Sequence, residues 1–297
     1  MGHKNKKSLT RQVQEAYEAK LKIGGSKYAD KKAGVYTDYI YSYSTLKTYM
    51  KQANYFVKYC KDNHNCKTLE DCRPYAAEWM ETRSSLSPYT QKLYIAALAK
   101  LYGTNSEELG IETPERKRND IIRSRGVKKR DSHFSEFKNA DIVLFCKCTG
   151  LRRSELGVVR GNMLTTDEKD RLCINITGNM AKGGRPRKVP IIGDVDRIVT
   201  MMNDAGDNKL FSKVPGNMDV HSYRAEYATA IYKAYARPIA EIPYDRVGKN
   251  GHRYQSEVYY CRGDQKGKVY DKVAMMEASR ALGHNRICVV GEHYLRV

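Results

Sequence analysis

A tyrosine near the end of the sequence and five basic side chains before it could together cleave a phosphodiester bond. The tyrosine is Tyr294, and the other five are Arg152, Lys182, His221, Arg224 and His284. A phenol can act as a nucleophile, guanidinium groups can hold phosphate oxygens and offset developing charge, and an amine can protonate a leaving oxygen. Chemistry of this kind requires no metal ion.

The spacing of these residues suggests how they converge. His221 and Arg224 are three positions apart and would share one face of a helix. Arg152 follows Gly150 and lies close to an expected helix start, where backbone approaches a phosphate most easily. An ordinary phenol has a pKa of about 10, so the nucleophile needs a base or a positive field, and two arginines would supply the field.

Charge and composition narrow the class of protein. The 297 residues include 53 Lys and Arg against 34 Asp and Glu, a formal net charge of +19. Such a chain attracts polyanions, and nucleic acid is the commonest of them. A ribosomal or purely electrostatic binder would share this charge, which therefore supports only nucleic-acid binding of some kind.

The sequence has no stretch suited to a membrane span or a secretory signal, and its eight cysteines fit the reduced thiols of a cytoplasmic protein. One group raises the question of zinc: Cys60, His64, Cys66 and Cys72. Its spacing matches no common zinc site, and buried thiols are the more usual case.

Hydrophobic periodicity predicts a mainly α chain with a small antiparallel β-sheet, an α+β protein of two domains. We expect a basic N-terminal arm over 1–34, a helical domain over 35–112, a basic linker over 113–131 and a second domain over 132–297. One expected helix begins at Ser44. The other expected helices span 69–83, 89–102, 195–205, 221–237 and 272–282. The expected strands are 172–177 and 188–192, on either side of a turn rich in Gly and Lys.

The linker is a predicted DNA contact, although any solvated linker would have a similar composition. Its basic residues are Arg116, Lys117, Arg118, Arg123, Arg125, Lys128, Lys129 and Arg130. Arg185 and Arg187, in the turn of the second domain, are predicted to contact DNA as well.

Four boxes in the second domain resemble those of the tyrosine recombinase (lambda integrase) family. They are Thr149–Leu156, Ala181–Pro190, His221–Arg224, and Leu282–His284 with Tyr294. They occur in the family's order and cover roughly residues 140–297. Any one of them alone would be weak, and the four together are a specific signal.

The resemblance implies a helical core-binding domain and a catalytic domain that form a C-shaped clamp on DNA. It makes Tyr294 the nucleophile, His221 the acceptor of its proton, and Lys182 the general acid that protonates the leaving 5′-oxygen. Arg185, Arg187 and Lys188 compete with Lys182 for that last role, and Lys182, which precedes two glycines, is favoured.

Arg152 and Arg224 would hold the phosphate, with Arg152 preferred to Arg153 because it directly follows Gly-Leu. His284 would donate a hydrogen bond to the phosphate, and Glu155 would position Arg152. The resemblance further implies a 3′-phosphotyrosyl intermediate, no cofactor and no metal, double-stranded DNA as partner, and four protomers around two duplexes.

The sequence departs from the family pattern in three places. Tyr294 lies one residue further from Gly283-His284 than the family pattern leads us to expect, so the loop expected over 285–293 could be bulged or cross differently. The stretch between Arg224 and His284 is long, with an excess over 238–272 that is rich in Arg, Lys and Tyr. Within it, 254–260 and 268–270 could form a β-hairpin around Arg262-Gly263-Asp264. The insertion could touch DNA or a neighbouring subunit, or could be a plain loop. Three residues follow Tyr294, whereas relatives commonly extend a further helix that docks on a neighbour, so we expect protomer contacts to come from the arm or the insertion.

The favoured function is a site-specific recombinase, the integrase of a mobile element such as a conjugative transposon, acting in the bacterial cytoplasm at the nucleoid. Accessory bending or directionality factors could assist it. The alternatives are a Xer-like chromosome or plasmid resolvase, a type IB topoisomerase with the same chemistry, and a DNA-binding regulator with an inactive site.

Overall fold

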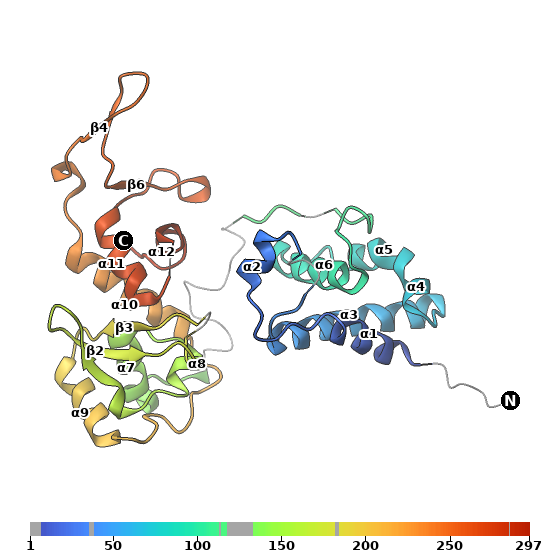
Figure 1. Ribbon diagram of the computed structural model, residues 1–297, viewed down its shortest axis with the longest axis horizontal. Coiled ribbons are helices and arrows are strands. Elements are labelled where there is room, and N and C mark those ends of the chain that lie inside the picture. The colour runs from blue at the N-terminus through green and yellow to red at the C-terminus, as the bar shows by residue number, and fades with distance from the viewer. Residues whose placement is uncertain (1–6, 36–38, 113, 118–132, 182–183, 285) are drawn as a thin grey trace. The chain divides into compact units, whose positions relative to one another are not determined.

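The chain, seen in a computed structural model, divides into two units, residues 1–120 and 121–297 (Figure 1). The structure describes residues 7–35, 39–112, 114–117, 133–181, 184–284 and 286–297. Helices predominate and the strands form small antiparallel sheets, which confirms the predicted α+β class. Within the described ranges, none of the helices is both long and apolar enough to cross a membrane.

Three longer helices build the first unit: α1 (Leu9–Glu18), α3 (Tyr43–His64) and α6 (Pro88–Tyr102). They enclose a core that includes Phe56 and Trp79, whose rings meet edge to face with centroids 5.4 Å apart. Ser42 caps α3 at its N-terminus, and Pro88 occupies the first turn of α6, where its missing N–H costs nothing.

Two segments of this unit differ from expectation. Residues 9–18 are not part of a mobile arm: Leu9, Val13 and Tyr17 recur every fourth position and are buried in the core as one face of α1. The sequence is compatible with a helix over 12–23, and the structure places the helix at Leu9–Glu18. The helix expected over 69–83 is divided into α4 (Leu69–Cys72), η1 (Arg73–Tyr75) and α5 (Ala76–Glu81), because Pro74 has no N–H to continue the ladder.

The cysteine group lies in this unit. Cys60, Cys66 and Cys72 are buried, while the His64 ring stacks on Tyr75 at 3.6 Å between centroids. His64 Nε2 lies 2.9 Å from a carboxylate oxygen of Glu78. In the described part of the chain, no three His, Cys, Asp or Glu side chains are placed to hold a metal ion.

The second unit is organised around α10 (Val220–Tyr235), which packs against α7 (Ala140–Thr149) and α11 (Lys272–Leu282). A three-stranded antiparallel sheet adjoins them, in the order β1 (Leu164–Thr166), β2 (Leu172–Ile176), β3 (Arg187–Pro190). The short helix α8 (Arg153–Leu156) follows α7, and α9 (Val195–Ala205) follows the sheet.

The predicted hairpin in the 238–272 insertion is confirmed in part. β6 (Val258–Tyr260) pairs with β7 (Val269–Asp271), but Tyr254 belongs to β5 (Arg253–Tyr254), which pairs with β4 (Arg246–Val247). The chain before Tyr294, expected as a loop, is the helix α12 (Ile287–His293). Its β-branched residues and short length gave no helical signal.

Candidate active site

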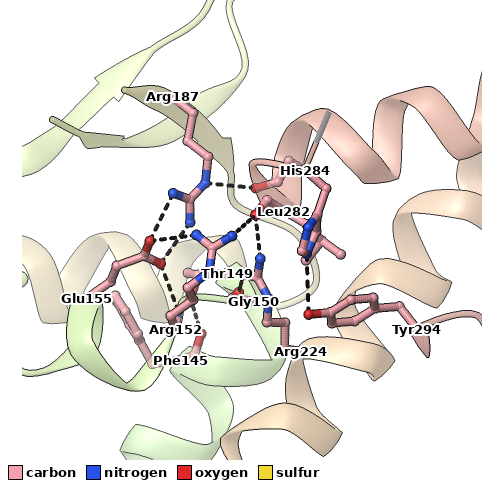
Figure 2. Close-up of polar contacts among 11 residues, drawn as sticks. Phe145, Thr149, Gly150, Arg152, Glu155, Arg187, Arg224, Leu282, His284 and Tyr294 are labelled. Carbon is pink, nitrogen blue, oxygen red and sulfur yellow. Dashed lines mark hydrogen bonds and ion pairs between the residues drawn. The ribbon is translucent and has the colours of Figure 1, made fainter. Parts of the chain in front are cut away.

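Side chains from the ends of four helices meet in the second unit. Figure 2 shows Arg152 at the start of α8, Arg224 on α10, His284 after α11 and Tyr294 after α12 turned toward one another. His221, on the first turn of α10, completes the group, because its ring centroid lies 4.9 Å from that of Tyr294. Five of the six residues named from the sequence are therefore close in space.

Tyr294 is held in place by both its backbone and its ring. Its N–H donates to Val290 O at 2.9 Å and its carbonyl accepts from Thr229 Oγ1 on α10 at 3.3 Å. The phenol oxygen lies 3.3 Å from His284 Nε2, and the residue is 7% exposed. The hydroxyl is thus fixed beside an imidazole nitrogen.

Arg224 is buried (2% exposed), and its two terminal nitrogens donate to the carbonyls of Gly150 and Leu282. Its Nε is buried and has no hydrogen-bond partner among the described residues. Burial lowers the pKa of this guanidinium to about 10, so it stays charged at neutral pH. Gly150 is required here: its φ is +57°, and a Cβ would lie 2.3 Å from the Tyr227 ring.

Arg152 shares a backbone acceptor with Arg224. One terminal nitrogen donates to Leu282 O at 3.0 Å and the other to Glu155 Oε1 at 2.9 Å. Leu282 ends α11, so its carbonyl carries the negative end of the helix dipole. That carbonyl fixes the two guanidinium groups side by side.

Glu155 and Arg187 form an ion pair that contacts Arg152. Arg187 donates to both oxygens of Glu155 at 2.9 and 2.8 Å, and its Nε donates to Ala281 O at 3.2 Å. Burial alone would raise the pKa of Glu155, but the hydrogen bonds and charge of Arg187, together with Arg152, hold it at about 2. The carboxylate therefore stays ionised and accepts hydrogen bonds from both arginines.

Arg187 corrects an expectation. We expected it to face DNA, yet its side chain is 7% exposed and committed to Glu155. A sequence signal existed: Arg187 is two positions before the buried Val189, so the alternation of β3 places both on the inner face.

The charges of the site are unbalanced. The site holds three guanidinium groups and one carboxylate, which pairs with Arg152 and Arg187 but not with Arg224, and this leaves a positive site suited to an anion. Burial, assisted by Arg224, Arg152 and Arg187, lowers the pKa of His284 to about 4. Partial loss of hydration lowers the pKa of His221 too, against the opposing effect of Asp219. Both imidazoles are neutral at pH 7 and can accept a proton.

The remaining sequence predictions fall partly outside the described residues. Lys182 lies there, as do Arg118, Arg123, Arg125, Lys128, Lys129 and Arg130. Of the described residues, Arg116, Lys117 and Arg185 are exposed, and the Arg116 guanidinium lies 5.4 Å from the centre of the Tyr89 ring. Arg153, the competitor of Arg152, instead donates to the carbonyls of Pro215 and Met218.

No protein-family model and no curated protein matches the chain. Three solved structures similar to it are fragments of the Tn1549 transposon integrase. Two are complexes with circular intermediate DNA. One has 14% sequence identity and a TM-score of 0.45, and the match covers 98% of this chain and 96% of that chain. The other has 13% sequence identity and a TM-score of 0.44, and the match covers 96% of this chain and 95% of that chain. The third is a complex with transposon right end DNA, at 13% identity and a TM-score of 0.42 over 98% and 96%.

Proposed function

We propose that this protein is a site-specific tyrosine recombinase that integrates and excises a mobile element. The observation that carries the proposal is the meeting of a fixed phenol, two neutral imidazoles and a carboxylate-supported group of arginines in one site. The net charge of +19 suits a DNA substrate. Arg152, His221, Arg224, His284 and Tyr294, which come from three of the four boxes, lie together in this site and support the proposal.

In the proposed reaction a DNA phosphate enters beside Arg152 and Arg224. Their guanidinium groups hold its non-bridging oxygens and offset the charge that builds in the transition state. The oxygen of Tyr294 attacks phosphorus, and its proton passes to a neutral imidazole of the site. The sequence assigns this role to His221, and His284 has its Nε2 3.3 Å from the same oxygen.

The bond from phosphorus to the 5′-oxygen then breaks, and that oxygen takes a proton from Lys182, as the family resemblance implies. The product is a 3′-phosphotyrosyl link and a free 5′-hydroxyl. A 5′-hydroxyl from another strand can reverse the step, so rejoining requires neither ATP nor a metal ion. The proposal includes the helical first unit as a second DNA-holding domain and a tetramer as the complete assembly.

The proposal is tested with nicked suicide duplexes taken from the two ends of the element that encodes the protein. With EDTA present, the wild type should accumulate a covalent protein–DNA adduct that survives denaturation. Tyr294→Phe should bind the same duplex with unchanged affinity and form no adduct. Adducts with the Phe variant would remove Tyr294 as the nucleophile, and relaxation of any supercoiled plasmid without strand exchange would favour a type IB topoisomerase.

A further inference from the structure

A two-stranded ribbon projects from the loop between α10 and α11. Figure 1 shows β4 and its partner strand extending away from the helices of the second unit. The proposed reaction assigns nothing to this ribbon, which consists of residues 244–254.

The base of the ribbon is anchored to the helices that carry the active site. Gln255, 4% exposed, donates from its amide to the carbonyls of Ile239 and Ile242 at 2.9 and 2.6 Å. At the start of α11, the buried Asp271 accepts two hydrogen bonds of 2.8 Å from the side chain of Arg237. Because α10 and α11 also position Arg224 and Leu282, the ribbon has a fixed place relative to the site.

The ribbon itself is exposed and cationic. Every residue of 244–254 is exposed apart from the partly buried Gly248. Its charged side chains are Asp245, Arg246, Lys249 and Arg253. Asp245 is turned back toward the base, where both carboxylate oxygens accept from Ser256. None of the ion pairs found among the described residues involves Arg246, Lys249 or Arg253. Arg253 donates to the carbonyl of Tyr244 at 3.2 Å and lies 6.0 Å from the centre of its ring, and all three cations remain exposed without a carboxylate partner.

The strand register distributes the cations over both faces. Arg246 is opposite Tyr254, and Val247 is opposite Arg253. Opposite residues of an antiparallel pair lie on the same face and successive residues on opposite faces. Each face therefore presents one arginine, and Lys249 lies in the turn between the strands.

We propose that this ribbon binds double-stranded DNA to one side of the cleaved phosphate, because its base lies at the opposite ends of α10 and α11 from Arg224 and Leu282, roughly 15 Å away at 1.5 Å per helical residue. There it would enter the major groove and contact phosphates on both of its walls. This inference rests on the proposed function for the presence of DNA. A ribbon with its side chains is about 10 Å thick, the spacing at which sheets stack. The major groove, about 12 Å wide, admits it, whereas the minor groove, about 6 Å wide, does not.

A neighbouring subunit fits these observations less well. The centre of a protein interface is depleted of charged side chains, because each buried charge loses its hydration. Burying Arg246, Lys249 and Arg253 without partners would carry that cost three times. DNA phosphates instead pair with such cations and release counterions.

The test uses the full chain and a duplex on which the wild type binds. The ribbon variant combines Arg246→Ala, Lys249→Ala and Arg253→Ala. The control variant removes three exposed lysines of the same unit, by Lys138→Ala, Lys213→Ala and Lys233→Ala. Affinity is measured from low to physiological salt, and thermal unfolding checks that each variant is folded.

We expect the ribbon variant to bind more weakly, and its slope of log affinity against log salt to fall by about 2 to 3, close to one unit for each lost phosphate contact. The control, with the same net charge, should keep a slope nearer to that of the wild type. Equal slopes for the wild type and the ribbon variant would overturn the inference. So would unchanged affinity of the first protomer with loss of larger complexes, because the ribbon would then contact protein. A wild type that binds no duplex would contradict the proposed function itself.

Discussion

At the residue scale, the site depends on how one carboxylate organises several cations. Glu155 is fully buried and accepts from Arg152 and Arg187, and it thereby fixes the arginine that shares Leu282 O with Arg224. Such a group is preorganised for an anion, because its dipoles and charges need not reorient when the anion enters.

Glu155→Gln should leave the buried guanidinium group of Arg187 and the partly buried one of Arg152 without their counter-charge. Removing one partner of a buried ion pair costs about 3 to 5 kcal/mol, and we expect the free energy of unfolding in urea to fall by that amount. Glu168→Gln, at an exposed position, is the control and should change it by less than about 0.5 kcal/mol. A loss below 1 kcal/mol for Glu155→Gln would show that the carboxylate is dispensable.

Arg187 is a positioning residue, and Arg187→Met should slow adduct formation about 100-fold, the order expected when supporting contacts shift a reacting group. DNA affinity should change little, because the side chain is buried. Arg187→Lys should not restore the rate, since an ammonium group cannot make the two-pronged contact to Glu155. Arg185→Met, on the exposed turn, should have the opposite effect: DNA binding should weaken, while the rate of adduct formation at saturating DNA should stay unchanged. An Arg187→Met variant with normal rate would contradict this role.

His284 gives the stability of the protein a pH dependence of known sign. Its pKa falls from about 6.5 in an unfolded chain to about 4 in the folded one. Between those values only the unfolded state takes up the proton, so stability is complete above pH 6.5 and is lost as the pH falls toward 4. His284→Gln should flatten the change of unfolding free energy over this window, measured by urea titration. An unaltered slope would mean that His284 is protonated in the folded protein.

At the element scale, α10 holds the nucleophile segment through Thr229. Its hydroxyl donates to Tyr294 O and accepts from the N–H of Arg296. Thr229→Val keeps the shape but removes both hydrogen bonds, and should lower stability by about 1 to 3 kcal/mol by leaving buried groups unpaired. Adduct formation should slow at the same time. Thr200→Val, whose hydroxyl bonds only to its own helix on an exposed face, is the control and should affect neither.

The elements predictable from sequence are those whose ends carry local signals. Ser87-Pro88 starts α6 and Gly283 ends α11 in a left-handed conformation, as expected from their types. The sequence allows a helix over 12–23 but not its packing into the core, because the stripe of three apolar residues in α1 is diluted by polar neighbours. The helix α12 gave no signal, because tertiary packing stabilises a weak helix former.

The residues of the candidate site also divide into those that the sequence could predict and those that it could not. Residues in contiguous boxes, such as His221 with Arg224, could be named because the box resembles that of the family, and their spacing also places them on one helix face. The role of Arg187 could not be predicted, because it depends on contacts to Glu155 and Ala281, which lie 32 and 94 residues away along the chain. The carbonyl of Leu282, a joint acceptor for two arginines, has no side-chain signal.

At the scale of the whole molecule, Tyr294, the proposed nucleophile, is packed into its own second unit. Leu295, the next residue, is 1% exposed in the core of that unit, and Arg296 donates to Ser222 on α10. We therefore predict cleavage in cis. A mixture of Tyr294→Phe and Arg224→Ala, each inactive alone, should form no adducts on suicide duplexes. Restored activity in the mixture would show that one protomer lends its tyrosine to another.

The central claim is that Tyr294 becomes covalently joined to DNA, and mass spectrometry of the trapped adduct tests it most directly. Nuclease and trypsin treatment of the adduct should leave nucleotide mass on the peptide 287–296, in which Tyr294 is the one tyrosine. The account predicts that fragmentation places this mass on Tyr294. Nucleotide mass on any other residue, or a DNA-bound wild type with no modified peptide, would contradict it.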